Sequence, residues 1–195
     1  MKQNIKIGVL ALQGAFIEHI KMLNVLGVAT KEIRQKSDFE KENIDGIVLP
    51  GGESTVMKKL LNDLGLFQPL KQALTSGLPA FGTCAGLIIM AKNFEDSPHK
   101  HLDLMDITVM RHGFGRQIGS FKTQGDFAGI GTIPMVFIRG PYITKVENNA
   151  KILAKIDDKI VAARQNNLLA VAFHPELTNN PSVHNYFLDM VRKKH

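Results

Sequence analysis

The sequence predicts an α/β fold in which helices flank a mostly parallel central sheet and the C-terminal half adds an antiparallel extension. Two observations lead to this fold class. Up to about residue 90, short and almost continuously apolar segments alternate with segments of helical periodicity, as in parallel, doubly wound sheets. From about residue 104, short strand patterns follow one another, which favours antiparallel pairing.

The first half begins with an apolar segment, 5–12, that is typical of a strand buried on both faces. Further strands are predicted at 28–33, 45–50 and 78–81. The helix patterns between and after them begin near Phe16, Ser54, Gln68 and Leu87. Gly27 is the predicted end of the first helix, and Ser54 is the predicted N-terminal cap of the second.

The second half contains strand patterns at 107–110, 133–139, 151–156, 159–164 and 168–173. Asp157-Asp158 predicts a hairpin turn. The chain closes on an amphipathic helix, with Asn180 as its predicted cap and Pro181 at its first helical position. No linker, repeat or low-complexity segment interrupts the sequence, so residues 1–195 are predicted to form a single domain.

Composition excludes several classes of protein. A hydrophobic fraction of 44% and a charged fraction of 22% are ordinary for globular proteins. The net charge of +6 comes from scattered lysines without a recognised nucleic-acid-binding motif, so no nucleic-acid partner is expected. No apolar segment reaches the ~18 residues of a membrane span. A single cysteine and the absence of a signal-peptide pattern predict a cytoplasmic protein.

The segment Gly82-Thr83-Cys84-Ala85-Gly86 joins a predicted strand directly to a predicted helix. A nucleophile at such a turn projects from the sheet edge, and crowding requires small residues two positions before and after it. Gly82 and Gly86 meet that requirement. The helix N-terminus favours a thiolate, and the Ala85 N–H lies where a tetrahedral oxyanion needs a donor. A free cysteine is most often a small buried hydrophobe, but the paired glycines favour Cys84 as a nucleophile.

The segment Phe173-His174-Pro175-Glu176 follows the last predicted strand. Pro175 favours extended backbone at His174, and side chains two positions apart in an extended chain point the same way. His174 and Glu176 are therefore predicted to meet Cys84 at the carboxyl edge of the sheet as a triad. An isolated His-Pro-Glu is more often a solvated loop, and it is the pairing with the cysteine turn that favours the triad.

A second cluster, His99-Lys100-His101 with Asp103, offers an alternative site of metal type. It lacks a fourth ligand and a recognised spacing. We interpret it as a solvated loop and expect no metal site.

These motifs, in this order, resemble those of the triad glutamine amidotransferases, whose three-layer, flavodoxin-like class I fold the chain is then expected to share. More narrowly, the chain resembles the glutaminase subunits of pyridoxal phosphate synthase. The segments that carry the narrower resemblance are G-V-L-A-L-Q-G-A (8–15), L-P-G-G-E-S-T (49–55), F-G-T-C-A-G-L-I-I (81–89), F-G-R-Q (114–117), F-I-R-G-P (137–141) and F-H-P-E-L-T (173–178).

The resemblance implies hydrolysis of L-glutamine to L-glutamate and ammonia. Cys84 would attack the side-chain amide, His174 would pass the thiol proton to the departing ammonia, and Glu176 would hold the imidazole. Backbone N–H groups of Gly52 and Ala85 would form the oxyanion hole. The positions that match glutamine-binding residues are Gly51, Gly52, Glu53, Arg111, Ile138 and Arg139. Arg116 is an alternative to Arg111 for the substrate carboxylate.

The resemblance also implies that the partner is a synthase subunit, bound in a hetero-oligomeric complex. Ammonia would pass to it for a condensation of a pentose phosphate with a triose phosphate. Gln13-Gly14 would lie where a peptide rearrangement completes the oxyanion hole, and the first helix, with Glu18 and His19, would lie near the interface. Pyridoxal phosphate would be the product of the complex, so no cofactor is expected in this chain.

Two positions depart from the family pattern. His112 follows Arg111 where asparagine is usual, and Gly140 stands where alanine is common. Three alternatives stay open. One is an ammonia-supplying subunit of another pathway, which would not explain the narrower segments. Another is a regulatory or scaffolding subunit with an idle triad. A cysteine-based hydrolase or chaperone is disfavoured by the separate glutamine-binding segments.

Overall fold

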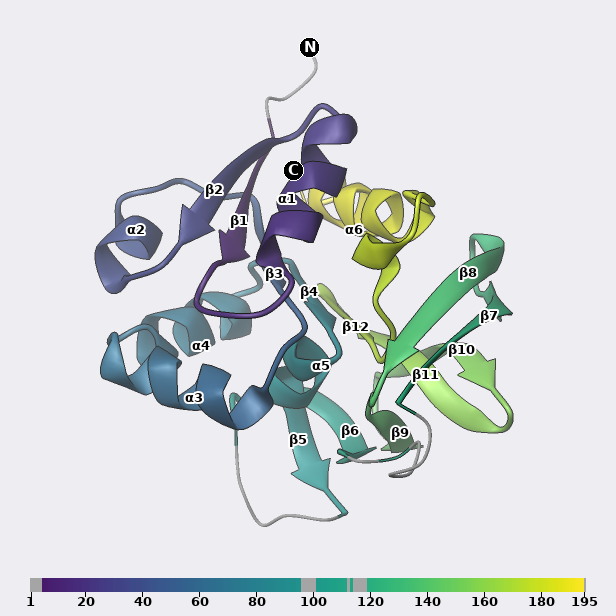
Figure 1. Ribbon diagram of the computed structural model, residues 1–195. Coiled ribbons are helices and arrows are strands. Elements are labelled where there is room, and N and C mark those ends of the chain that lie inside the picture. The colour runs from purple at the N-terminus through teal and green to yellow at the C-terminus, as the bar shows by residue number, and fades with distance from the viewer. Residues whose placement is uncertain (1–4, 96–100, 112, 114–118, 195) are drawn as a thin grey trace.

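The computed structural model describes residues 5–95, 101–111, 113 and 119–194. Within these residues, the strands join into one continuous sheet that runs through the molecule, with helices packed on both of its faces (Figure 1). The predicted α/β class is confirmed.

Five strands form the parallel part of the sheet, in the order β2-β1-β3-β4-β12. They are β1 (Lys6–Leu10), β2 (Ala29–Ile33), β3 (Gly46–Leu49), β4 (Ala80–Thr83) and β12 (Leu168–Val171). The central strands β3, β4 and β12 are buried along their whole length. Burial on both faces explains why their sequences read as continuous apolar runs rather than as alternating ones.

The sheet continues antiparallel beyond β12, in the order β11-β10-β7-β8. These strands are β7 (Ser120–Phe127), β8 (Gly131–Ile138), β10 (Lys151–Ile156) and β11 (Lys159–Gln165). A branch from β11 contains β9 (Tyr142–Val146), β6 (Met105–Met110) and β5 (Ala91–Phe94). Asp157 and Asp158 have φ angles of 46° and 62° and close the predicted hairpin between β10 and β11.

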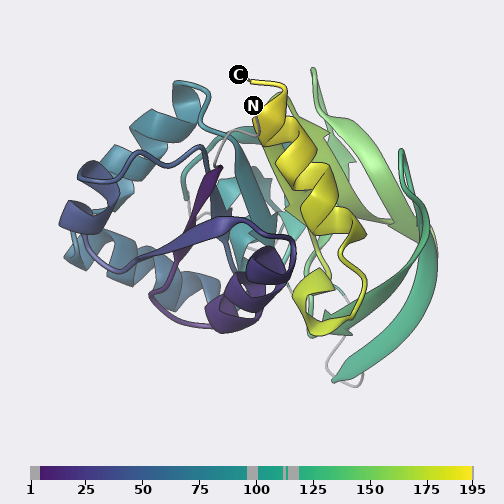
Figure 2. The same ribbon diagram turned by 90° about the horizontal axis from the view of Figure 1, so that it is seen from above.

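Helices α1 (Phe16–Val25) and α6 (Ser182–Arg192) cover one face of the parallel sheet (Figures 1 and 2). Helices α3 (Ser54–Asp63), α4 (Phe67–Thr75) and α5 (Ala85–Met90) cover the other face. The short α2 (Lys36–Glu40) lies beside β2. In the described part of the chain, no helix has the length and apolar character that crossing a membrane requires.

Two predicted helix boundaries are wrong by one residue. The cap of α3 is Glu53 rather than Ser54, because the Glu53 carboxylate accepts hydrogen bonds from the backbone N–H groups of Thr55 and Val56. Helix α6 begins after Pro181 rather than at it. Asn180 still stabilises that helix start, because its Oδ1 accepts from the N–H of Ser182 at 2.9 Å. Gly27 ends α1 as predicted, with a φ of 73°.

Helix α6 is held on the sheet by an aromatic contact between its buried face and β4. Phe187 is fully buried, and its ring lies 5.6 Å from the ring of Phe81. The same face of α6 buries Val183, Leu188 and Val191. Because α6 closes the chain, these apolar contacts keep the segment after β12 in place.

We predict that Phe187→Ala lowers the free energy of unfolding by about 3–5 kcal/mol, because it opens a cavity in the core. Urea denaturation measured against the wild type tests this. Val25→Ala is the matched control: Val25 is 82% exposed at the end of α1, and its loss is expected to cost less than about 0.5 kcal/mol. Equal effects of the two substitutions would contradict the assigned packing of α6.

Candidate active site

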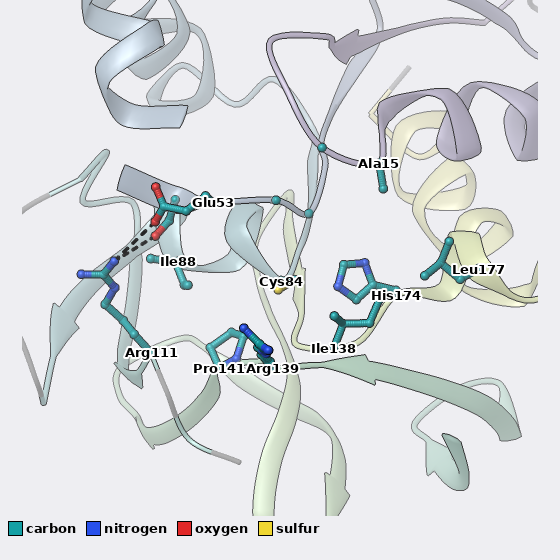
Figure 3. Close-up of a pocket in the computed structure, with 14 residues that line it drawn as sticks. Ala15, Glu53, Cys84, Ile88, Arg111, Ile138, Arg139, Pro141, His174 and Leu177 are labelled. Carbon is teal, nitrogen blue, oxygen red and sulfur yellow. Dashed lines mark hydrogen bonds and ion pairs between the residues drawn. The ribbon is translucent and has the colours of Figure 1, made fainter. Parts of the chain in front are cut away.

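The parallel strands β1, β3, β4 and β12 all end at the same edge of the sheet. The segments that follow them carry Gln13, Gly51, Cys84 and His174 respectively. A cavity of about 540 Å³ opens at this edge, and Cys84 and His174 both line it (Figure 3). This is where ligands bind in open α/β sheets.

Cys84 lies between β4 and α5 with a φ of 47°, a backbone conformation that residues other than glycine rarely adopt. Its backbone N–H donates to the carbonyl of Val171 on β12 at 2.9 Å, which fixes the turn against the neighbouring strand. A Cβ on Gly86 would overlap the carbonyl oxygen of Leu49, and one on Gly82 would lie 2.7 Å from the carbonyl carbon of Gly86. The predicted need for small residues on both sides of Cys84 is confirmed.

His174 and Glu176 lie together beneath the cavity. The Nδ1 atom of His174 is 2.7 Å from Oε1 of Glu176, and the side chain of Glu176 is fully buried. The route to this contact differs from the predicted one: residues Pro175–Leu177 form a 3₁₀ turn rather than extended backbone. The turn brings the carboxylate back toward the imidazole, while the His174 N–H donates to the carbonyl of Val136 on β8 at 2.8 Å.

The protonation of His174 is set by opposing effects. Burial alone lowers its pKa, but hydrogen bonds with Cys84 and Glu176, together with the charges of these groups, outweigh burial and raise the pKa to about 10. The ring is therefore an imidazolium at neutral pH. A cation in this position stabilises a thiolate at Cys84 and can later give up its proton to a leaving group.

The loop after β3 passes very close to this pair. A Cβ on Gly51 would overlap Cε1 of His174 and lie 3.4 Å from Cβ of Cys84. Gly52 has a φ of 152°, and a Cβ there would overlap the side-chain amide of Gln13. That amide holds the loop, because Gln13 Oε1 accepts from the N–H of Glu53 at 3.1 Å. Packing against His174 therefore requires glycine at position 51, and the backbone conformation favours glycine at position 52.

The segment after β1 supports the same loop. Ala15 donates its N–H to the carbonyl of Gly51 at 3.1 Å, and a Cβ on Gly14 would overlap that carbonyl oxygen. Gly14 has a φ of 81° and lines the cavity. Ala85 occupies the first position of α5, where a backbone N–H has no acceptor within its own helix.

Glu53 and Arg111 meet at the far end of the cavity (Figure 3). In this structure the Glu53 carboxylate caps α3, and the pKa of Glu53 is lowered because the N–H bonds from Thr55 and Val56, with the nearby Arg111, outweigh the opposing effect of burial. Arg111 donates from Nη2 to Ser54 Oγ and Thr55 Oγ1, at 3.3 and 3.1 Å. Its Nε is buried and has no hydrogen bond within the described residues.

The remaining wall of the cavity comes from the end of β8 and the residues after it. Ile138 and Arg139 line it as expected, and Arg139 has a φ of 43°. Gly140 fits its crowded position, because a Cβ there would lie 3.0 Å from the carbonyl oxygen of Ala172. Further lining residues, which the sequence analysis did not assign to the site, are Ala15, Ser54, Ile88, Pro141 and Leu177.

The predicted interface residues Glu18 and His19 both lie on α1, and their side chains differ in exposure. Glu18 on α1 is partly exposed, but the His19 side chain is fully buried. Its Nδ1 lies 2.9 Å from Nε2 of His184, and its Nε2 lies 3.2 Å from Oγ1 of Thr83 and 3.4 Å from Oε2 of Glu176. Helical periodicity places His19 on the inner face of α1, and only the tertiary structure reveals its neighbours.

Several residues named from the sequence lie outside the described residues. They are His99, Lys100, His112 and the segment 114–117 with Arg116. The interpretation of the alternative metal cluster as a solvated loop is wrong at His101, which is buried with its ring edge-on to Phe94 at 5.1 Å.

The arrangement can carry out acyl transfer. Three groups lie in a row beside the cavity: the cysteine at its strained turn, the imidazolium and the buried carboxylate. The N-terminus of a helix lies at the cysteine. Such a set supplies a nucleophile, a proton carrier, a group that orients it, and N–H donors for an oxyanion.

We predict that Gly51→Ala slows alkylation of Cys84 by iodoacetamide at pH 7 by about tenfold, because the added methyl displaces the imidazolium that favours the thiolate. The chain has one cysteine, so mass spectrometry reports this site alone. Gly119→Ala is the control, since a Cβ there meets no atom of the described residues within 4 Å. Alkylation of the Gly51 variant at the wild-type rate would show that His174 does not act on the thiol.

The sequence matches the SNO glutamine amidotransferase family over residues 9–193. Proteins named pyridoxal 5'-phosphate synthase subunit PdxT resemble it along nearly their whole length. The protein from Methanocorpusculum labreanum is 57% identical over 186 residues, covering 95% of this chain and 97% of the relative. The protein from Haemophilus influenzae strain PittEE is 51% identical over 189 residues, covering 96% and 98%.

The chain is also similar to solved structures. A structure described as a glutamine amidotransferase has a TM-score of 0.90 and 39% identity, and the match covers 95% of this chain and 98% of the other. A putative GMP synthase subunit from Thermoplasma acidophilum shares the fold, with a TM-score of 0.71 and 18% identity over 100% of this chain and 97% of the other. Together with the family match, these similarities show that the chain belongs to the SNO glutamine amidotransferase family.

Proposed function

We propose that this chain hydrolyses L-glutamine to L-glutamate and ammonia through Cys84, His174 and Glu176, and passes the ammonia to a synthase that makes pyridoxal phosphate. The observation that carries the proposal is the meeting of these three side chains at one edge of the sheet, beside a 540 Å³ cavity. Membership of a glutamine amidotransferase family supports the reaction class.

In the first half of the proposed reaction, the Cys84 thiolate attacks the side-chain amide carbon of glutamine. The tetrahedral oxyanion is stabilised by the N–H groups of Gly52 and Ala85. His174, which holds the proton that came from the thiol, donates it to the nitrogen as the carbon–nitrogen bond breaks. Ammonia leaves, and a glutamyl thioester remains on Cys84.

In the second half, water attacks the thioester. The now neutral His174 takes a proton from that water, and the breaking carbon–sulfur bond returns its electron pair to Cys84 as thiolate. Glutamate leaves and the imidazolium is restored. The role of Glu176 in both halves is to orient the ring and to stabilise the imidazolium.

Glutamine would lie with its side-chain amide at Cys84 and its amino-acid group at the Glu53–Arg111 end of the cavity. Arg111 suits the α-carboxylate, because its buried Nε has no hydrogen bond within the described residues. Glu53 suits the α-ammonium: its carboxylate is ionised and about half exposed while it caps α3. The backbone of Gly51 and Gly52, with Ile138 and Arg139, would hold the carbon chain between them.

The proposed partner follows from the relatives, whose shared name is that of a pyridoxal 5'-phosphate synthase subunit. Gln13, Gly14 and the exposed side of α1, with Glu18, are the proposed region of activation and contact. The continuous sheet supports the proposal that residues 1–195 act as one domain. A single cysteine without a disulfide partner fits the proposed cytoplasmic location.

The decisive experiment measures ammonia and glutamate released from glutamine, with and without the synthase subunit. We expect release that rises on addition of the synthase and falls to background in Cys84→Ala. Release that is indifferent to the synthase would keep the glutaminase and remove the proposed partner. No release from a folded wild-type protein in either condition would favour a regulatory subunit with an idle triad.

The pH dependence tests the roles of His174 and Glu176. Since the pKa of His174 is raised to about 10, the imidazolium is available below that pH and is lost above it, so activity should decline near pH 10. Glu176→Gln removes a charge that supports the imidazolium. We expect this decline to move to lower pH and kcat to fall on the order of 100-fold. Glutamate release measured from pH 6 to 11, a range that brackets the His174 pKa of about 10, reports the position of the decline and the size of kcat. An unmoved pH profile in Glu176→Gln would rule out Glu176 as the partner of the imidazole.

A further inference from the structure

The two oxygens of Glu176 have different surroundings. Oε1 is 2.7 Å from His174 Nδ1. Oε2 is buried, has no hydrogen bond of good geometry within the described residues, and lies 3.4 Å from His19 Nε2. A buried carboxylate oxygen without a donor is costly. The side chain placed to supply one is therefore His19, on the opposite side of Glu176 from His174.

The tautomer of His19 can be deduced from its other neighbour. His184 Nδ1 is buried and has no hydrogen bond within the described residues. A buried N–H without an acceptor costs more than a bare ring nitrogen, so the proton of a neutral His184 belongs on Nε2. That proton is donated to His19 Nδ1 at 2.9 Å. His19 must then carry its own proton on Nε2, which faces Thr83 Oγ1 and Glu176 Oε2.

Both rings of this pair are neutral. Burial lowers the pKa of His19 well below its usual value, and His184 and His174 lower it further. Burial also lowers the pKa of His184, to about 4. The contact between His19 and Glu176 is thus one between a neutral N–H and a carboxylate rather than an ion pair. Of the two histidines beside Glu176, His174 is therefore the one that carries a positive charge.

We propose that His19 is a positioning residue for the triad: its Nε2–H, fixed in place by His184, holds the Glu176 carboxylate in the orientation that supports the His174 imidazolium. This proposal deepens the proposed function and rests on it. The relay runs from α6 through α1 to the 3₁₀ turn after β12, and ends at Cys84. His19 touches no substrate, so its effect on catalysis passes through Glu176.

A packing role alone would act differently. His19 lies edge-on to Phe81 at 5.8 Å, and His184 lies edge-on to the same ring at 5.4 Å. Truncation of any member of this cluster should lower stability. Only loss of the His19 N–H toward Glu176 should also make the charged form of His174 less stable. The titratable groups facing His19 are His184 on α6, Glu176 on the 3₁₀ turn, and His174 just before that turn.

The test compares His19→Ala, His19→Gln and Phe81→Leu with the wild type, in the presence of the synthase subunit. For His19→Ala we expect kcat about tenfold lower, KM within about twofold, and a decline in activity that begins at lower pH. Glutamine at this position can place an amide N–H near the position of Nε2, so His19→Gln should restore the pH profile. Phe81→Leu, which has no polar contact with Glu176, should lower stability and leave the profile unmoved.

A second readout does not depend on glutamine. Alkylation of Cys84 by iodoacetamide at pH 7 should slow in His19→Ala and recover in His19→Gln. His184→Leu removes the donor to His19 without a change at Glu176, so it should also slow the alkylation of Cys84. This variant replaces His19→Ala in the test if His19→Ala does not fold. An unchanged pH profile and alkylation rate in His19→Ala, or no recovery in His19→Gln, would overturn the proposal. A wild type without glutaminase activity would instead reject the proposed function.

Discussion

The close approach of α5 to β3 is the constraint on which the placement of Cys84 depends. The backbone of Gly86 presses against the carbonyl of Leu49, so closely that a Cβ on Gly86 would overlap its oxygen. With the helix so near the sheet, the chain can leave β4 only through a left-handed residue, and Cys84 is that residue. Its hydrogen bond to Val171 then ties the turn to β12. The strand β12, which holds the turn at Cys84, is therefore also the strand that leads to His174.

One carboxylate faces two histidines whose protonation differs. His174 lies beside Cys84 and Glu176, and the partners outweigh the cost of burying its charge. His19 is also close to Glu176, but its other neighbours are a second imidazole and a hydroxyl, and burial prevails. The result is a charged ring on the cavity side and neutral rings on the core side. The positive charge is thereby confined to the side where the thiol lies.

The parts that sequence predicts best are those that local physics dictates. Buried parallel strands, the Asp157-Asp158 turn and the glycines around Cys84 leave signals that need no tertiary information. Strand β7 leaves no such signal, because before the buried Phe127 its residues are only exposed or half-buried, and its sequence is mostly polar. The sequence pattern favours Ser54 as the cap of α3, because a short hydroxyl side chain is the commoner cap and the reach of Glu53 is not visible in a pattern. His19 reads as part of an amphipathic helix face, and its link to Glu176 joins residues 157 positions apart, which no local pattern can report.

The segment from Gln13 to His19 joins two parts of the site that are otherwise distant in sequence. At its start, Gln13 and Ala15 hold the Gly51–Glu53 loop through hydrogen bonds to Glu53 and Gly51. At its end, His19 reaches Glu176 from the core. Between these points α1 exposes Ile17, which is 48% accessible, on its outer side. The contacts to the loop come from the residues just before α1, and the contact to the carboxylate comes from the first turn of α1, so one short segment carries both. The Gly51–Glu53 loop and the Glu176 carboxylate are thus linked through the segment from Gln13 to His19.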